Sequence, residues 1–197
     1  MTKSKISTKY FVEMALLVAI ILLMAFTPIG YIRTGGLSIT LLVVPVAVGA
    51  VTLGPAAGAV LGAVFGMTSF IQCFGMEPFG TALFGINPFF TFIVCFLPRI
   101  AEGFLTGCIY RGLRKTKIPS GISVTIANLC CPILNTVFFM SALVTLFAGT
   151  MREAYGMTKV IPFVAAFVGV NGVIEAAVCF VIGTAISAAL KKALRYQ

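Results

Sequence analysis

Histidine, aspartate and tryptophan are absent from the 197 residues, and only 10% of the residues are charged. Without histidine and aspartate, Ser/His/Asp and Cys/His catalytic arrangements lose an essential member, and most metal sites lose their usual ligands. No phosphate-binding G-x-x-x-x-G-K-[ST] run occurs, so we do not expect this chain to hydrolyse ATP. The sequence therefore predicts a protein that is not an enzyme, with no catalytic residue, metal site or cofactor of its own.

Apolar residues make up 60% of the chain, which is too large a share for a water-facing surface. We expect an all-α integral membrane protein with a single transmembrane domain over residues 1–197, because no linker divides the chain. The net charge is +9, and the basic residues gather in short segments beside apolar runs. We therefore interpret this charge as setting the orientation of the chain in the membrane and not as a nucleic-acid-binding surface. The six cysteines form no C-x-x-C pair, and we interpret them as buried packing residues.

Six segments are apolar and long enough to predict transmembrane helices. The first follows three lysines, as a signal peptide would. Its apolar run is long, however, and no A-x-A cleavage site follows it, so we expect it to be retained. The predicted spans are 11–28, 38–53, 56–72, 89–111, 121–149 and 160–190.

The distribution of lysine and arginine predicts the orientation of these spans. Three segments, before the first span, between the fourth and fifth and after the sixth, hold most of the basic residues, whereas Arg33, Arg152 and Lys159 lie in the opposite loops. Cytoplasmic loops carry the excess of basic residues, so both termini should be cytoplasmic. The outer loops are then 29–37, 73–88 and 150–159. The second is rich in Gly and Phe; it either covers an outward-facing pocket or rests on the membrane surface.

Three of the predicted spans each carry a pair of polar residues at helical spacing. The pairs are Arg99 with Glu102, Asn128 with Asn135, and Asn171 with Glu175. Such residues are costly in hydrocarbon, so the simplest arrangement turns the pairs toward one another. In a purely structural interpretation, Arg99 forms an ion pair with Glu102 or Glu175 and the asparagines bridge helices. Alternatively, the pairs line a binding pocket whose apolar walls are phenylalanines. With two amides beside the second outer loop, the candidate substrate-binding residues are Arg99, Glu102, Asn128, Asn135, Asn171, Glu175, Gln72 and Asn87.

Small residues at four-residue spacing mark two helix faces. Gly54, Gly58, Gly62 and Gly66 predict a face for very close helix packing. Ala15 and Ala19 form a second small-residue face in the first span, although this motif is common by chance.

In the combination and order of its motifs, the sequence resembles the substrate-binding S component of energy-coupling factor (ECF) vitamin transporters, most closely the pantothenate-specific type. The resemblance covers nearly the whole chain and includes the six spans. It also rests on Ala15-x-x-x-Ala19, LGPAAG over 53–58, Leu97-Pro98-Arg99 with Glu102-Gly103, Asn135-Thr136, and NGVIEA over 171–176.

The resemblance implies capture of a small vitamin, pantothenate in the first instance, in a prokaryotic plasma membrane. It implies delivery to a scaffold membrane subunit and two cytoplasmic ATPases, which use the ATP. Ala15 and Ala19 would dock on the scaffold, and the S component would topple within the bilayer to carry the vitamin. For pantothenate, Arg99 suits the carboxylate and Asn135 and Asn171 suit the hydroxyls and amide.

Three other functions stay open at this stage. The chain is an S component for another vitamin or metabolite, a membrane scaffold or accessory protein without a substrate, or a membrane enzyme that uses Glu102 and Glu175. The last is disfavoured because no nucleophile accompanies the two carboxyl groups.

Overall fold

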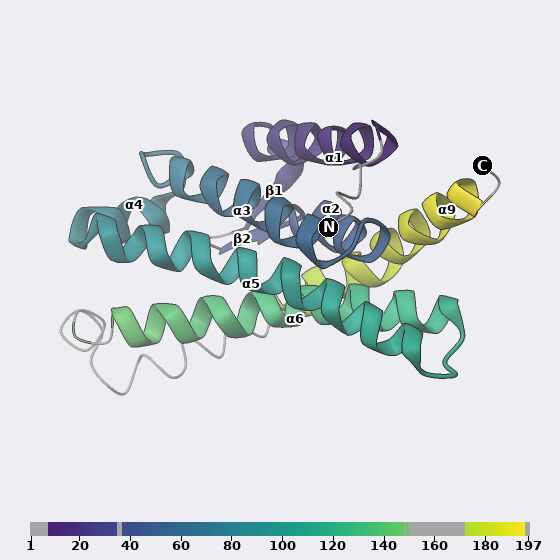
Figure 1. Cartoon of the computed structure of the whole chain (residues 1–197). Coiled ribbons are helices and arrows are strands. Elements are labelled where there is room, and N and C mark those ends of the chain that lie inside the picture. The colour runs from purple at the N-terminus through teal and green to yellow at the C-terminus, as the bar shows by residue number, and fades with distance from the viewer. Residues whose placement is uncertain (1–7, 35–36, 148, 150–171, 196–197) are drawn as a thin grey trace, which may run out of the picture.

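Helices make up most of the computed structural model, which describes residues 8–34, 37–147, 149 and 172–195. The two longest helices pack side by side, and a short β-hairpin lies beside the bundle (Figure 1). The elements are α1 (Thr8–Phe26), η1 (Pro28–Gly30), β1 (Tyr31–Thr34), β2 (Leu37–Thr40), α2 (Val43–Thr52), α3 (Pro55–Gln72), α4 (Pro78–Ile86), α5 (Pro88–Lys115), α6 (Ser120–Leu146), η2 (Cys179–Gly183) and α9 (Thr184–Arg195).

Five helices in the described ranges are long and apolar enough to cross a membrane. Four of them, α1, α3, α5 and α6, lie where the first, third, fourth and fifth spans were predicted, with bounds that differ by a few residues. The fifth runs from Gly172 to Leu190 through the π-helical turn η2 and forms the second half of the predicted sixth span. The first half of that span lies outside the described residues.

The second predicted span, 38–53, is wrong in its first part. Leu37–Thr40 forms a β-strand, and the helix α2 begins only at Val43. Pro45 explains the late start, because its missing N–H is tolerated in the first helical turn but not deeper in a helix. At about 1.5 Å per residue, the ten residues of α2 reach about 15 Å, half of a typical hydrocarbon core.

Two segments predicted as outer loops hold regular structure. Segment 29–37 contains the end of η1 and strand β1, which pairs with β2 in an antiparallel hairpin that runs from Tyr31↔Thr40 to Thr34↔Leu37. Segment 73–88 contains α4, whose first residue is Pro78 and whose N-cap is Glu77. An acceptor side chain followed by proline is a typical helix start, and Asn87-Pro88 repeats it at α5. The third loop, 150–159, lies outside the described residues.

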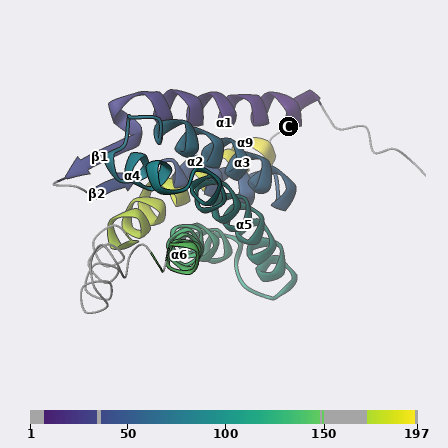
Figure 2. The ribbon, with the colours of Figure 1, turned by 90° about the vertical axis from the view of Figure 1, so that its left-hand side faces the viewer.

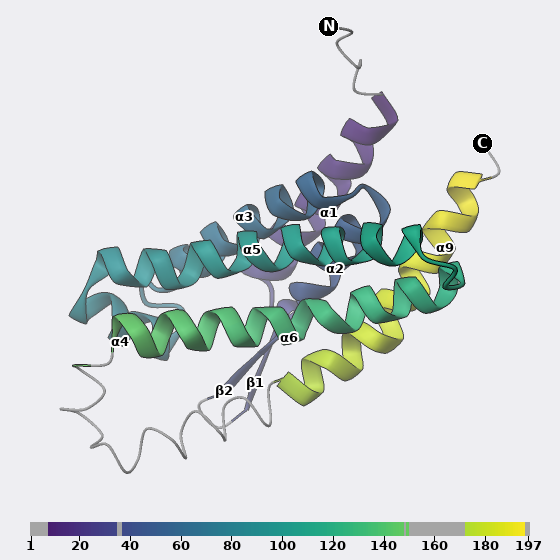
Figure 3. The same cartoon turned by 60° about the horizontal axis from the view of Figure 1, so that its bottom comes forward.

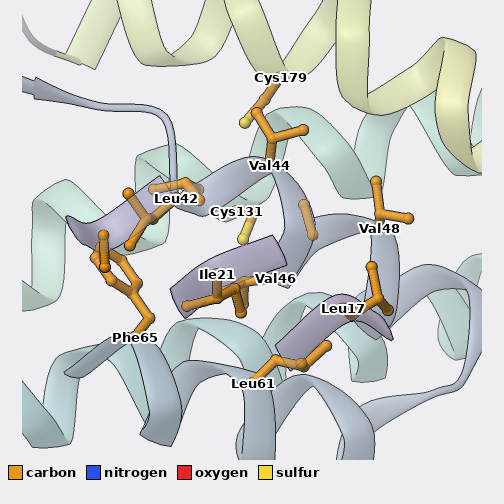
Figure 4. Close-up of a cluster of buried hydrophobic side chains, with 13 residues drawn as sticks. Leu17, Ile21, Leu42, Val44, Val46, Val48, Leu61, Phe65, Cys131 and Cys179 are labelled. Carbon is orange, nitrogen blue, oxygen red and sulfur yellow. The ribbon is translucent and has the colours of Figure 1, made fainter. Parts of the chain in front are cut away.

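The short helix α2 forms the centre of the main hydrophobic core. Seen along the bundle, α1 covers one side of the molecule over α2 and α3, and α6 lies on the opposite side (Figure 2). All residues from Val43 to Val51 are buried. Side chains of α1, α3, α6 and η2 surround them in Figure 4, among them Leu17, Ile21, Leu61, Phe65, Cys131 and Cys179.

The outer faces of the long helices carry large apolar side chains. Phe11 and Leu23 on α1, Ile133 on α6, and Val173 and Val181 on the last helix are each more than half exposed. A water-soluble protein rarely exposes apolar surface so continuously, whereas the hydrocarbon of a bilayer solvates it. This surface accounts for the high hydropathy of the sequence.

Three chain segments with basic residues lie at one end of the molecule. The start of α1, the turn between α5 and α6, and the end of α9 are all toward the right of Figure 1 and at the top or right of Figure 3, whereas α4 lies at the left of both. The last turn of α5 contains Arg114 and Lys115 at that end.

Candidate functional site

The packing of α3 against α5 positions the candidate site, and glycines permit it. A Cβ atom added at Gly62 would collide with the carbonyl oxygen of Arg99, and one at Gly58 would collide with that of Gly103. At Gly66 the added Cβ would lie 2.9 Å from the carbonyl oxygen of Cys95. The two backbones therefore approach closely at three points, each about one helical turn from the next.

Gly54 has a different role from the other three glycines. It precedes α3 as its N-cap and has a φ of 102°, a conformation that residues with a Cβ rarely adopt. It therefore makes the turn from α2 into α3, next to Arg111 of α5.

Four polar or thiol side chains form one buried stripe along α5. Cys95, Arg99, Glu102 and Thr106 are three or four residues apart and share a helix face. Glu102 and Thr106 are fully buried, and Arg99 is 9% exposed. The spacing of Arg99 and Glu102 indicated this face, and Thr106, one turn further on, was missed.

The guanidinium of Arg99 is held by the helix in which it lies. Pro98 has no N–H, so the carbonyl of Val94 lacks its usual helical partner. Arg99 Nη1 donates to that oxygen at 2.8 Å. The guanidinium carbon lies 4.5 Å from the ring centre of Phe139 and 5.4 Å from that of Phe65. These cation–π contacts favour the charge away from water.

No ion pair joins Arg99 to a carboxylate within the described part of the chain, and its Nε has no hydrogen-bond partner there. The predicted pairing with Glu102 or Glu175 is therefore not seen. The charge of Arg99 still acts on both carboxyl groups through space. The guanidinium thus keeps hydrogen-bonding capacity beside two acidic groups.

Glu175 joins three elements. Its Oε1 accepts from the backbone N–H of Thr40 at 3.0 Å, and its Oε2 accepts from Asn135 Nδ2 at 3.4 Å. Glu175 lies in the last helix, Asn135 in α6, and Thr40 at the end of the hairpin. The backbone donor was not predictable, because the sequence pattern gives no sign of which loop crosses the site.

Several buried oxygen atoms of this group have no partner in the described ranges. They are both oxygens of Glu102 and Oδ1 of Asn135. Buried polar atoms normally form hydrogen bonds, because leaving them unpaired costs a few kcal/mol. Together with Arg99 Nε they are the groups that can still bond to a polar ligand.

Three other predicted residues form hydrogen bonds that join or cap elements of the fold. Gln72 Nε2 donates to the carbonyl oxygen of Ala25 at 2.6 Å and so joins α3 to α1. Asn87 accepts from the N–H of Phe90 and caps α5. Asn128 donates to Val124 O and to Ser187 Oγ, which ties α6 to α9. Asn171 lies outside the described residues.

Comparison with known proteins identifies the family of the chain. The family model "ECF transporter, substrate-specific component" matches residues 9–187. The chain belongs to this family. A curated relative, the "Pantothenic acid transporter PanT" of Lactococcus lactis subsp. cremoris (strain MG1363), is 28% identical over 165 residues, which cover 78% of each chain.

Membership makes this S component a membrane transport protein and not an enzyme. In general terms, the family implies a vitamin substrate, a scaffold subunit and ATPase subunits. Within its described residues, no group of three or more His, Cys, Asp or Glu side chains is arranged to hold a metal ion.

The small-residue face of α1 points away from the bundle of the S component. Leu17, Ile21 and Ala25 are buried on one side of the helix, whereas Ala15 and Ala19 are exposed. Ala15 and Ala19 therefore lie where a helix of another protein can reach them.

Proposed function

We propose that this S component captures pantothenate and delivers it to a scaffold subunit and two ATPases, which hydrolyse the ATP. One observation carries the proposal: Arg99 is a buried guanidinium without a carboxylate partner among the described residues, beside unpaired oxygen atoms. A buried cation in this state suits an anionic ligand that also carries hydrogen-bond donors. The pantothenic acid transporter of L. lactis supports the choice of substrate.

Each polar part of pantothenate finds a complementary group in this site. Its carboxylate accepts from Arg99, which can present two parallel N–H donors. Its hydroxyl groups and amide N–H donate to Asn135 Oδ1 and to Glu102, whose oxygens are unpaired. Asn171 stays a predicted contact of the same kind. The whole chain then acts as one substrate-binding unit.

The substrate assignment is tested by removing the charge from each partner of the contact, the arginine and the ligand, in turn. Arg99→Gln should weaken binding of pantothenate more than binding of pantothenol, the neutral alcohol analogue, by about 1.5–3 kcal/mol, the size of a charge-assisted hydrogen bond. Isothermal titration of both ligands against the purified protein measures this difference. Arg114→Gln, in the exposed last turn of the same helix, is the matched control and should leave both affinities unchanged.

Each contrary outcome removes a different part of the proposal. Equal losses for the two ligands would separate Arg99 from the carboxylate and favour binding nearer α4. Tight binding of another vitamin, with none of pantothenate, would remove the substrate and keep the S component. Absence of any small-molecule ligand would favour the accessory role.

We further propose that both termini are cytoplasmic. The basic ends of the described helices lie together, at the right of Figure 1 and away from α4, and basic residues are enriched on the cytoplasmic side. In a cysteine-free background, Lys3→Cys and Arg195→Cys should resist a membrane-impermeant maleimide in intact cells and react after permeabilisation. Labelling of either position from outside would reverse the orientation.

A further inference from the structure

Two cysteine thiols meet where α3 ends. The sulfur atoms of Cys73 and Cys95 lie 3.8 Å apart, although the residues are 22 positions apart in the sequence. Both side chains are buried, with 3% and 7% of their surface exposed. Cys73 Sγ is also 3.3 Å from the carbonyl oxygen of Ser69. Within the described ranges, no second pair of thiols makes such a contact.

The pair lies one helical turn from Arg99, where α4 packs against the ends of α3 and α5. Cys95 precedes Arg99 by one helical turn on the buried stripe of α5. Cys73 opens the connection from α3 to α4, and α4 packs directly on its sulfur, since a Cβ added at Gly80 would lie 2.6 Å from it.

Aromatic contacts hold the same region together without a covalent bond. Phe84 of α4 lies 4.6 Å from Phe74, measured between ring centres, and Phe70 of α3 lies 5.1 Å from Phe92 of α5. These rings keep the ends of α3, α4 and α5 in place around the two thiols, so the thiols remain close without being bonded.

We propose that Cys73 and Cys95 are a modification site that closes to an intramolecular disulfide. A disulfide bond is about 2 Å long, so the sulfurs, now 3.8 Å apart, must approach by about 2 Å. The two thiols lose two protons and two electrons in this step. A thiol-oxidising disulfide in the cell, or the azo compound diamide in the test tube, accepts them, and diamide becomes the corresponding hydrazine.

The bond ties the α3–α4 connection to α5 one turn from Arg99. In the reduced protein, the end of α3 and this part of α5 are linked along the chain only through α4 and its two short connections, and in the oxidised protein the disulfide joins Cys73 to Cys95 directly and closes that segment into a covalent loop. With the orientation proposed above, this end faces the exterior, where disulfides persist. The existence of the bond can be tested without any assumption about the substrate.

The test uses the full-length protein in lipid nanodiscs, before and after treatment with diamide. Free thiols are then alkylated under denaturing conditions, and intact mass and peptide mapping are recorded. The oxidised protein should be lighter by two hydrogen atoms before alkylation, should carry two alkyl groups fewer after it, and should yield a linked Cys73–Cys95 peptide. Reduction should reverse all three changes.

Cysteine-to-serine variants identify the two cysteines that form the bond. Cys73→Ser and Cys95→Ser should each abolish the linked species, whereas Cys108→Ser, on the same helix as Cys95, should retain it. Full alkylation of Cys73 and Cys95 after diamide would overturn the proposal, as would a bond between other cysteines. Neither result would bear on pantothenate binding, which is measured separately.

Discussion

Gly62→Ala is expected to destabilise the protein and to lower its affinity for substrate. The new Cβ would collide with the carbonyl oxygen of Arg99, and a backbone atom cannot turn aside as a side chain can. Separating α3 from α5 should cost about 1–3 kcal/mol of unfolding free energy, the usual range for overpacking. The same separation displaces the turn of α5 that carries Arg99, so binding weakens along with stability.

Thermal unfolding in detergent, with and without ligand, measures this effect. The matched control is Gly112→Ala, because its Cβ would meet no atom within 4 Å and because it also lies on a helix. There the loss of backbone freedom in the unfolded chain should leave stability unchanged or raise it by about 0.5–1 kcal/mol. If both variants melted at the same temperature, the contact between α3 and α5 would not be as tight as described.

Ala15→Trp and Ala19→Trp are expected to abolish uptake while leaving binding to the isolated subunit intact. Both alanines are exposed on α1, and the side of the helix that packs on the bundle lies opposite. An indole ring there would prevent close approach of a scaffold helix, because small-residue faces work by letting backbones come near. Vitamin uptake by cells that express the complete transporter, together with titration of the purified subunit, measures the two quantities separately.

Val173→Trp is the control for a bulky ring on the lipid-facing surface. Val173 is 67% exposed on the last helix, and a tryptophan there should leave uptake unchanged. Normal uptake by an Ala15→Trp, Ala19→Trp double variant would place the docking surface elsewhere. Loss of binding by either single variant would instead show that the substitution disturbs the fold.

The sequence predicted the long helices because each carries its own signal. α3 and α5 begin with proline at their first position, and α1, α3, α5 and α6 are apolar over more than four turns. The hairpin carries a signal of its own, Gly35-Gly36 between two four-residue runs, and was missed because residues 38–40 were counted in an apolar span. The helix α4 was missed because it is short and apolar. A short apolar segment does not reveal whether it forms a strand, a loop or a helix, since surrounding elements decide which backbone groups are paired.

The site was predictable within one helix and less so between helices. Spacing alone placed Arg99 and Glu102 on one face of α5. It gave no information on the distance between Arg99 and Glu175, because helix rotation and tilt depend on packing. The contact of Glu175 with Thr40 arises from tertiary structure. The hydrogen bond from Arg99 to the carbonyl of Val94 could have been predicted from Pro98, because a proline in a helix leaves the carbonyl four residues earlier without its N–H partner.

The length of α2 has a consequence for the biosynthesis of the protein. Insertion into a membrane responds to apolar windows of about 19 residues, and α2 has only ten. Its side chains are covered by neighbours, among them residues of α3 and α6 that leave the ribosome after it. Until those helices have entered the bilayer, α1 alone offers α2 a protein surface to pack against. It therefore takes its final position only once α6 has been synthesised, and a ribosome stalled before α6 would hold a chain whose core cannot yet form.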